Sequence, residues 1–155
     1  MPNFAEGTLK LRGERENIKS ALKEMLASDT VTISEENDGA KLFFSTTNSY
    51  FYINGTKRAF FDKNLIEILF EETFEVIEID NFIQAWGVIP ENFLVFSKKH
   101  GVDIKIFAFE QGLEYSQEIE IINGAITRNI KSKYVDYKWD VPFSKLGGWK
   151  SGIEI

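Results

Sequence analysis

Three dipeptides that end in glycine divide much of the chain into runs of strand length. Asp38-Gly39, Asn54-Gly55 and Asn123-Gly124 each lie between segments that are rich in β-branched and aromatic residues. Asn, Asp and Gly adopt positive φ values at little steric cost, and two-residue turns between antiparallel strands require such values. The sequence therefore predicts three β-hairpins and a fold that contains much antiparallel sheet.

Two segments have the pattern of amphipathic helices. From Glu14 to Ser28, apolar residues recur at helical spacing, and acidic residues lie near the positive end of the helix dipole. From Pro90 to His100, the proline suits a first helical turn, basic residues fill the last turn, and Gly101 can supply a left-handed cap. The apolar stripe of the first helix must be buried, and we expect it to pack on one face of a sheet.

Further strands are predicted over 8–12, 73–86 and 102–109, where apolar residues alternate with polar ones or β-branched and aromatic residues dominate. Within the second of these segments, three isoleucines are predicted to share one face: Ile77, Ile79 and Ile83. The segment 64–70 fits both a short helix and a strand, and we expect a helix. The aromatic residues of 133–150 indicate that this segment docks on the body of the protein.

The predicted order of strand, helix, strands, strand, helix and strand is that of a split βαβ unit with inserted and appended hairpins. We therefore expect an α+β, ferredoxin-like sandwich without iron, in which an antiparallel sheet carries two main helices and additional β-hairpins. The 155 residues contain no linker or repeat, and 43% of them are hydrophobic. Residues 1–155 are therefore expected to form one domain.

Charge and composition restrict the cellular compartment and the partners that we expect for the protein. The chain has no cysteine, which excludes disulfides and thiolate metal sites and is typical of the reducing cytoplasm. It has no stretch of roughly 18 apolar residues that could span a membrane, and no signal-peptide pattern. We predict a cytoplasmic protein without a membrane partner. Residues 64–97 contain seven acidic residues and no Lys or Arg, which suits either a binding face or solvated surface.

Several stretches, in order, resemble a known family: MPNFAEGTLKLRG, YINGTKRAFF, QAWGV, SKKHGVDIKIFAFEQGLEYSQEIEIINGAI and DYKWDVPFSKLGG. They resemble the YubB-like ferredoxin-like group, small proteins of bacteriophages and mobile elements in Gram-positive bacteria. Phe4 stands where a tryptophan is more usual in this group, and Val141 where a cysteine is often found. The resemblance implies a ferredoxin-like fold and a phage-associated setting, and it carries no activity or catalytic residue.

Four glutamates in one part of the chain are the first candidates for acid–base chemistry: Glu110, Glu114, Glu118 and Glu120. In the segment 115–122, Glu118 and Glu120 alternate with apolar residues, as on a half-solvated antiparallel strand. Glu110 and Glu114 flank Gly112 in a predicted turn. We expect all four carboxylates to contact water rather than a substrate.

Other signals of catalysis or of a cofactor are weak. His100 is the only histidine and lies at a predicted helix end, where its charge complements the dipole. The sequence contains no P-loop, GxGxxG, GxSxG or calcium-loop pattern. The stretch KIFAF at 105–109 overlaps the RNP1 pattern of RNA-binding sheets but departs from it at Ile106 and Glu110. We predict no enzyme, no cofactor, and no catalytic or metal-binding residue.

The sequence thus favours a protein that acts by binding another protein or by self-association. Tyr and Trp are frequent in binding hot spots, so five residues are the candidates for partner contact: Tyr50, Tyr52, Trp86, Trp139 and Trp149. Core packing is the competing interpretation, and it is favoured for Trp86. The alternative function is directed at nucleic acid, either by binding single strands or by imitating DNA charge to inhibit a host nuclease or defence system.

Overall fold

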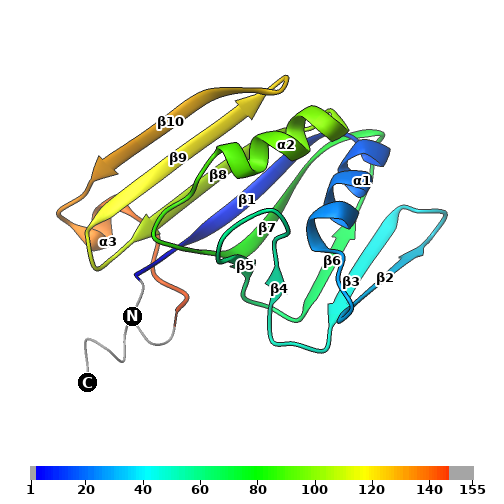
Figure 1. Ribbon diagram of the computed structural model, residues 1–155, viewed down its shortest axis with the longest axis horizontal. Coiled ribbons are helices and arrows are strands. Elements are labelled where there is room, and N and C mark those ends of the chain that lie inside the picture. Colours follow the sequence, from blue (N-terminus) through cyan, green and yellow to red (C-terminus); the bar gives the residue numbers. More distant parts are fainter. Residues whose placement is uncertain (1–2, 147–155) are drawn as a thin grey trace.

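A computed structural model describes residues 3–146 and has an α+β architecture, as predicted (Figure 1). Seven strands form the larger sheet: β1 (Phe4–Glu14), β4 (Phe51–Tyr52), β5 (Ala59–Phe61), β7 (Phe74–Ala85), β8 (Asp103–Glu110), β9 (Tyr115–Ile122) and β10 (Ala125–Lys133). Their order across the sheet is β10-β9-β8-β1-β7-β5-β4, and every neighbouring pair is antiparallel. The long strand β1 therefore lies at the centre.

A smaller antiparallel sheet has the order β2-β3-β6 and consists of β2 (Val31–Glu36), β3 (Lys41–Thr46) and β6 (Leu65–Leu69). The helix expected over 64–70 is therefore wrong. Ile66 and Ile68 point into the core, whereas the residues between and beside them are exposed. This alternation has the period of a strand, and pairing with β3 satisfies the backbone along one edge.

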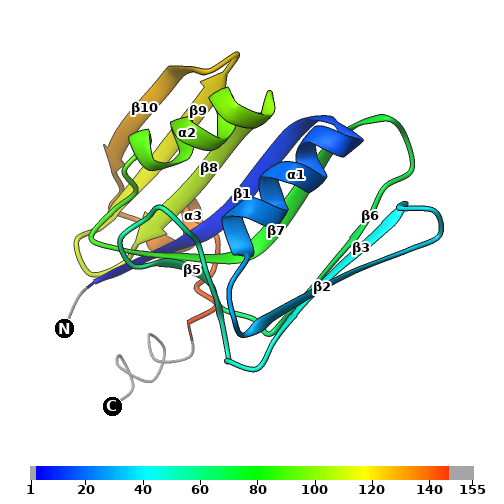
Figure 2. The ribbon, with the colours of Figure 1, turned by 45° about the vertical axis from the view of Figure 1, so that its right-hand side comes forward.

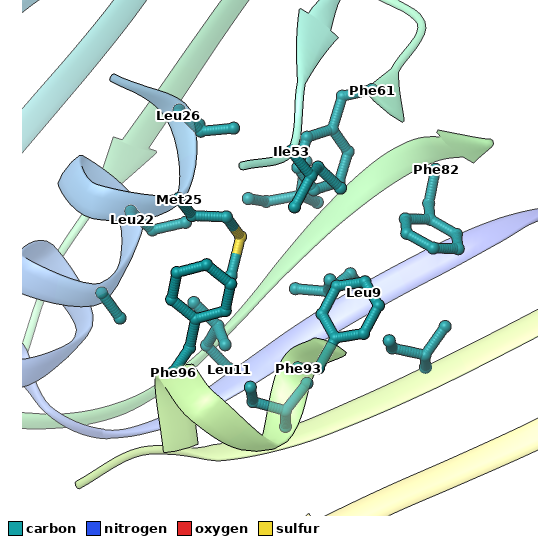
Figure 3. Packing of buried hydrophobic residues seen from close by; sticks show 14 of the residues in the cluster. Leu9, Leu11, Leu22, Met25, Leu26, Ile53, Phe61, Phe82, Phe93 and Phe96 are labelled. Atoms are coloured by element: carbon teal, nitrogen blue, oxygen red, sulfur yellow. The ribbon is translucent and has the colours of Figure 1, made fainter. Parts of the chain in front are cut away.

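Two helices, α1 (Arg15–Leu26) and α2 (Glu91–His100), cover the same face of the larger sheet and contact each other (Figure 2). Both agree with the predicted segments, and Gly101 caps α2 with a φ of 66°. The core lies between these helices and the sheet (Figure 3), where Leu22, Phe93 and Leu9 are fully buried. Complete burial of such a side chain contributes about 1.5–3 kcal/mol.

The three predicted hairpins are present, but two of them have longer turns, and the one between β2 and β3 spans residues 37–40. Asn123-Gly124 joins β9 to β10 with positive φ at both residues, as expected. The connection from β4 to β5 is also longer than two residues, and within it the Asn54 side chain binds the end of α1. Its side-chain amide donates to Glu24 O at 2.9 Å and to Ala27 O at 2.8 Å. It thus satisfies backbone carbonyls at the end of α1.

A local irregularity in β7 changes which residues face the core. Asn81 has a φ of 59°, and the pairing of β7 with β1 shifts between Gly7 and Leu9. Ile77 and Ile79 face the helices, but beyond the irregularity Phe82 takes that position and Ile83 turns to the opposite side. The prediction that the three isoleucines share one face is therefore wrong for Ile83, because a bulge reverses the alternation.

A buried cation joins α1 to the smaller sheet. Lys19 is almost fully buried, and its Nζ lies 2.5 Å from Glu35 Oε1 and donates to Gly39 O at 3.1 Å. Lys23 contacts the other oxygen of Glu35 at 2.7 Å. The hydrogen bonds from Lys19 and Lys23 hold the pKa of Glu35 below its ordinary value of 4.5. The carboxylate form of Glu35 therefore stabilises the folded state.

We predict that Glu35→Gln lowers the free energy of unfolding by about 1 kcal/mol at pH 7, because it removes the nearer of the two carboxylates that pair with Lys19. Since the folded-state pKa of Glu35 is lowered, this stabilisation is complete above pH 4.5 and disappears as the pH falls through the folded-state value. Urea unfolding at pH 7 and under acidic conditions measures both effects, with Glu36→Gln as the exposed control. An equal loss of stability at both pH values contradicts the account.

Candidate functional site

The face of the larger sheet that points away from α1 and α2, which we call the back face, has a charged half and an apolar half. Ion pairs link neighbouring strands in the charged half: Arg12–Asp103, Lys10–Glu78, Lys105–Glu120 and Arg128–Glu118. Their shortest N–O distances lie between 2.7 and 3.8 Å, and exposed pairs of this kind each contribute little to stability. The prediction that Glu118 and Glu120 lie on the solvated side of their strand is confirmed.

The apolar half lies where β1 begins and where β7 and β8 end. Its side chains come from neighbouring strands: Phe4, Phe60, Ile83, Phe107 and Phe109. The ring centroids of Phe107 and Phe109 are 6.3 Å apart, and those of Phe4 and Phe60 are 6.0 Å apart. Because the helices cover the opposite face of the sheet, this apolar surface requires a cover of its own.

Residues 134–146, which we call the C-terminal segment, provide part of that cover. This segment includes the short helix α3 (Tyr137–Asp140) and lies on the side of the sheet away from the main helices (Figure 2). Phe109, Tyr134 and Val141 form a small second core, and Tyr137 packs against it. The predicted docking of this aromatic region is therefore confirmed for the described residues.

A buried carboxylate fixes the C-terminal segment to the sheet. Glu6 is only 4% exposed. Its Oε2 accepts a hydrogen bond from Ser144 Oγ, and its Oε1 accepts one from the backbone N–H of Lys145, both at 2.6 Å. Hydrogen bonds to an ionised acceptor are stronger than neutral ones, and together they satisfy both oxygens of this buried group. Lys145 Nζ also lies 3.2 Å from Asp80 on β7.

A pocket of about 200 Å³ remains between the C-terminal segment and the apolar half of the back face. Its apolar lining is formed by Ile83, Phe107, Phe109, Pro142, Phe143 and Leu146. Polar groups of Asp62 and Asn81 also line it, and Asn81 Nδ2 donates to Asp62 O. An apolar cavity of about 150 Å³ can hold a benzene ring. The back-face pocket therefore has room for one large apolar side chain.

The aromatic residues predicted from sequence lie apart from one another. Tyr50 and Tyr52 are partly exposed near the β4 edge, and the ring centroids of Tyr50 and Phe60 are 5.5 Å apart. Trp86 is 64% exposed, so the expected core packing of this residue is wrong. Trp139 is 87% exposed on α3, whereas Trp149 lies outside the described residues. No aromatic pair within residues 3–146 joins Trp86 or Trp139 to the tyrosines, and partner contact remains a prediction for all five residues.

Glu110 corrects the expectation that all four glutamates contact water. Its side chain is completely buried beside Tyr115, on the face of β8 that points toward the helices. One oxygen accepts the N–H of Leu113 at 2.6 Å, and the other has no hydrogen-bond partner among the described residues. Burial and then the Glu110 charge raise the pKa of Tyr115. Glu110 does not line the back-face pocket, and Glu114 is exposed in the adjacent turn.

The remaining candidate catalytic residue, His100, contacts a glutamate of the other main helix. His100 Nε2 lies 3.0 Å from Glu24 Oε1, which links the two main helices. Within residues 3–146, no group of three or more His, Asp or Glu side chains could hold a metal ion. No helix in the described part of the chain is long and apolar enough to cross a membrane. We therefore take the back-face pocket, which has a mostly apolar lining and is partly covered by the C-terminal segment, as the candidate site.

Sequence reasoning identified part of this site and missed the rest. The alternation of KIFAF places Phe107 and Phe109 on one face, and the aromatic residues of 133–150 predicted that this segment docks on the body of the protein. Glu6 and Ser144 were missed. The available signal was an acidic residue inside an otherwise apolar strand end, FAEG, which requires a hydrogen-bond partner when buried.

Comparison with known proteins gives no match: no family model, no curated protein and no solved structure is similar to this chain. The interpretation of the site therefore rests on its geometry and chemistry.

We predict that Glu6→Gln loosens the C-terminal segment, because the neutral amide is a weaker acceptor and one of its two groups is a donor. Hydrogen exchange of the backbone amides at 137–146 should accelerate, and the unfolding free energy should fall by about 1–3 kcal/mol. Glu118→Gln, on the charged half of the same face, is the matched control. It should leave amide exchange at 137–146 unchanged and should change the unfolding free energy by no more than about 0.5 kcal/mol. Unchanged exchange in Glu6→Gln would show that Glu6 does not fix this segment.

Proposed function

We propose that the protein acts without catalysis as a binding module for another protein, and that the back-face pocket receives a large apolar side chain of that partner. The observation that carries this proposal is the lining of the pocket. Aromatic and aliphatic side chains form its walls, and Phe143 at its edge is 67% exposed. Buried pockets that accept one apolar anchor are the usual centres of binding energy in protein interfaces.

The charges around the pocket favour a partner that carries a basic residue beside the apolar one. Asp62 is exposed and lies in no ion pair within the described residues. Asp80 is already neutralised, since Lys63 and Lys145 lie 2.5 and 3.2 Å from its carboxylate. The hydrogen bond from Lys63, with that from Lys145, lowers the pKa of Asp80. A lysine or arginine of the partner can therefore pair with Asp62 at the rim.

A role directed at nucleic acid, either single-strand binding or acidic mimicry of DNA, is the alternative and has less support. Base stacking on the RNP1-like strand needs exposed aromatic faces, whereas Phe109 on that strand is only 3% exposed beneath Tyr137 and Val141. Phosphate binding needs basic surroundings, whereas Glu6 and Asp62 line the pocket and its lysine, Lys145, is paired with Asp80. These groups suit an apolar or cationic ligand better than a phosphate backbone.

We further propose that the fold is ferredoxin-like at its centre and that the chain is a cytoplasmic, phage-associated protein of the YubB-like kind. The strand order β8-β1-β7-β5 supports the first point, together with α1 after β1 and α2 between β7 and β8. The sequence resemblance described above supports the second. The small sheet and the β9–β10 hairpin are then additions to that centre.

Thr8→Trp tests the proposed function, because Thr8 lines the pocket on a strand that tolerates aromatic residues. We expect this variant to fill the pocket and to lose a protein that the wild type retains in affinity purification from a nuclease-treated bacterial lysate. Lys10→Trp is the matched control, since Lys10 lies on the same face of the same strand but does not line the pocket. It should retain the partner.

Retention of the same proteins by both tryptophan variants contradicts the pocket as the binding site. Loss of all bound protein after nuclease treatment, in the wild type as well, favours the nucleic-acid alternative instead. Circular dichroism of each variant establishes that the substitutions leave the fold intact.

A further inference from the structure

Two outer strands, β10 of the larger sheet and β2 of the smaller sheet, each have one edge that pairs with no other described strand. Among the described residues, β10 pairs only with β9, and β2 pairs only with β3. Figures 1 and 2 both place β10 and β2 on opposite sides of the protein. Unpaired edges present N–H and C=O groups that can pair with another chain.

These two edges are better suited to strand pairing than the other outer edges. β2 has six residues and β10 has nine, whereas β4 has only two. The free side of β6 faces β7 and is closed at both ends, by the hydrogen bond from Asp62 N to Asn81 O and by the connection 70–73. In contrast, residues 127–133 of β10 are all exposed. At about 3.4 Å per residue, pairing along β2 spans roughly 20 Å.

The two edges carry opposite charges. β10 has three basic residues and no acidic one: Arg128, Lys131 and Lys133. The segment 29–38, which contains β2, has four acidic residues and no basic one: Asp29, Glu35, Glu36 and Asp38. Of these four acids, only Glu35 forms an ion pair with another described residue. The β2 edge therefore keeps negative charge that a basic edge can neutralise.

Charged residues on an edge strand commonly prevent unwanted pairing. In this chain, the distribution of charge prevents one kind of pairing and favours another. Two β10 edges repel each other, and two β2 edges do the same, whereas a β10 edge attracts a β2 edge. The occupant that these edges favour is therefore a second copy of the chain, which offers the opposite edge.

The directions of the side chains define a register for this pairing. Glu35 points toward α1, where it contacts Lys19, so Glu36 points to the opposite face of β2. Arg128 points to the back face of the larger sheet, where it contacts Glu118. If the faces that carry the helices lie on the same side, Glu36 and Arg128 therefore project to the same side as well.

Placing Glu36 opposite Arg128 in an antiparallel pair fixes the positions of the other residues. Thr32 then lies opposite Ser132, because each is four residues along its strand. Asp29, just before β2, comes close to the last basic residue of β10, which is Lys133. Acidic and basic groups thus meet at both ends of the paired strands.

We propose that the protein self-associates head to tail, and that the β2 edge of one copy pairs as an antiparallel strand with the β10 edge of the next. Backbone hydrogen bonds supply affinity, as in other cases of strand addition. Because the two edges differ, the interface is heterologous and builds chains or rings of copies instead of a two-fold dimer. Neither edge lines the back-face pocket, so this inference goes beyond the proposed function.

Sedimentation measures this association. The average mass should rise with protein concentration beyond that of a dimer, and it should fall as the salt concentration rises. Glu36→Lys should weaken the association about tenfold, because repulsion from Arg128 replaces attraction. A chain that carries both Glu36→Lys and Arg128→Glu restores the pair in reversed order and should recover most of the association. Glu78→Lys, on β7 and away from both edges, is the control and should weaken it by no more than about twofold.

Cross-linking tests the register, and the absence of native cysteine makes it specific. When the Thr32→Cys and Ser132→Cys proteins are mixed and oxidised, a disulfide should join one variant to the other. Ser116→Cys is the matched control, because Ser116 lies opposite Ser132 on β9 and is therefore one strand away from the edge. It should not cross-link to Thr32→Cys.

Three results overturn the proposal. These are a protein that stays monomeric as its concentration rises, an association that stops at a dimer, and cross-linked homodimers of either variant in place of the mixed product. Thr8→Trp should associate as the wild type does, so a failure of self-association is distinguishable from a failure of the back-face pocket. Circular dichroism establishes that each variant is folded.

Discussion

The structure depends on a simple constraint: α1 and α2 can cover only one face of the larger sheet, yet one end of the other face is apolar as well. Phe107 and Phe109 on that back face cannot be left bare without cost. The C-terminal segment meets this need by forming a small second core around Phe109. Because the segment covers only part of the apolar half, it also creates the pocket that is the best candidate for function.

Glu6 makes this cover specific. An apolar contact alone allows a segment to slide, whereas a buried carboxylate with two short hydrogen bonds permits one position. The same carboxylate would be costly to bury if Ser144 and the backbone of Lys145 moved away. The position of the C-terminal segment, the shape of the pocket and the hydrogen bonds of Glu6 are therefore coupled. This coupling explains how a pocket can be maintained without a metal or a disulfide among the described residues.

Local chemistry predicted much of the fold, and tertiary context decided the rest. Turn residues and helix caps act within a few positions, so both main helices and the Asn123-Gly124 hairpin could be predicted. The segment 64–70 could not, because its alternation becomes decisive only when β3 pairs with it. Ile83 was misplaced because a bulge at Asn81 has no strong sequence signal. The hydrogen-bond partners of Glu6, Ser144 and Lys145, are distant in sequence, so the acidic residue in FAEG could indicate a need for partners but could not identify them.

If the back-face pocket accepts an apolar group, it should bind a small aromatic molecule. Titration of the isotope-labelled protein with indole, followed through methyl and aromatic resonances, tests it most directly. We expect saturable shifts confined to pocket residues such as Ile83, Phe107 and Leu146, and we expect Thr8→Trp to lose them. Shifts spread evenly over exposed apolar residues elsewhere, such as Val95 on α2, or no saturable shifts at Ile83, would contradict it.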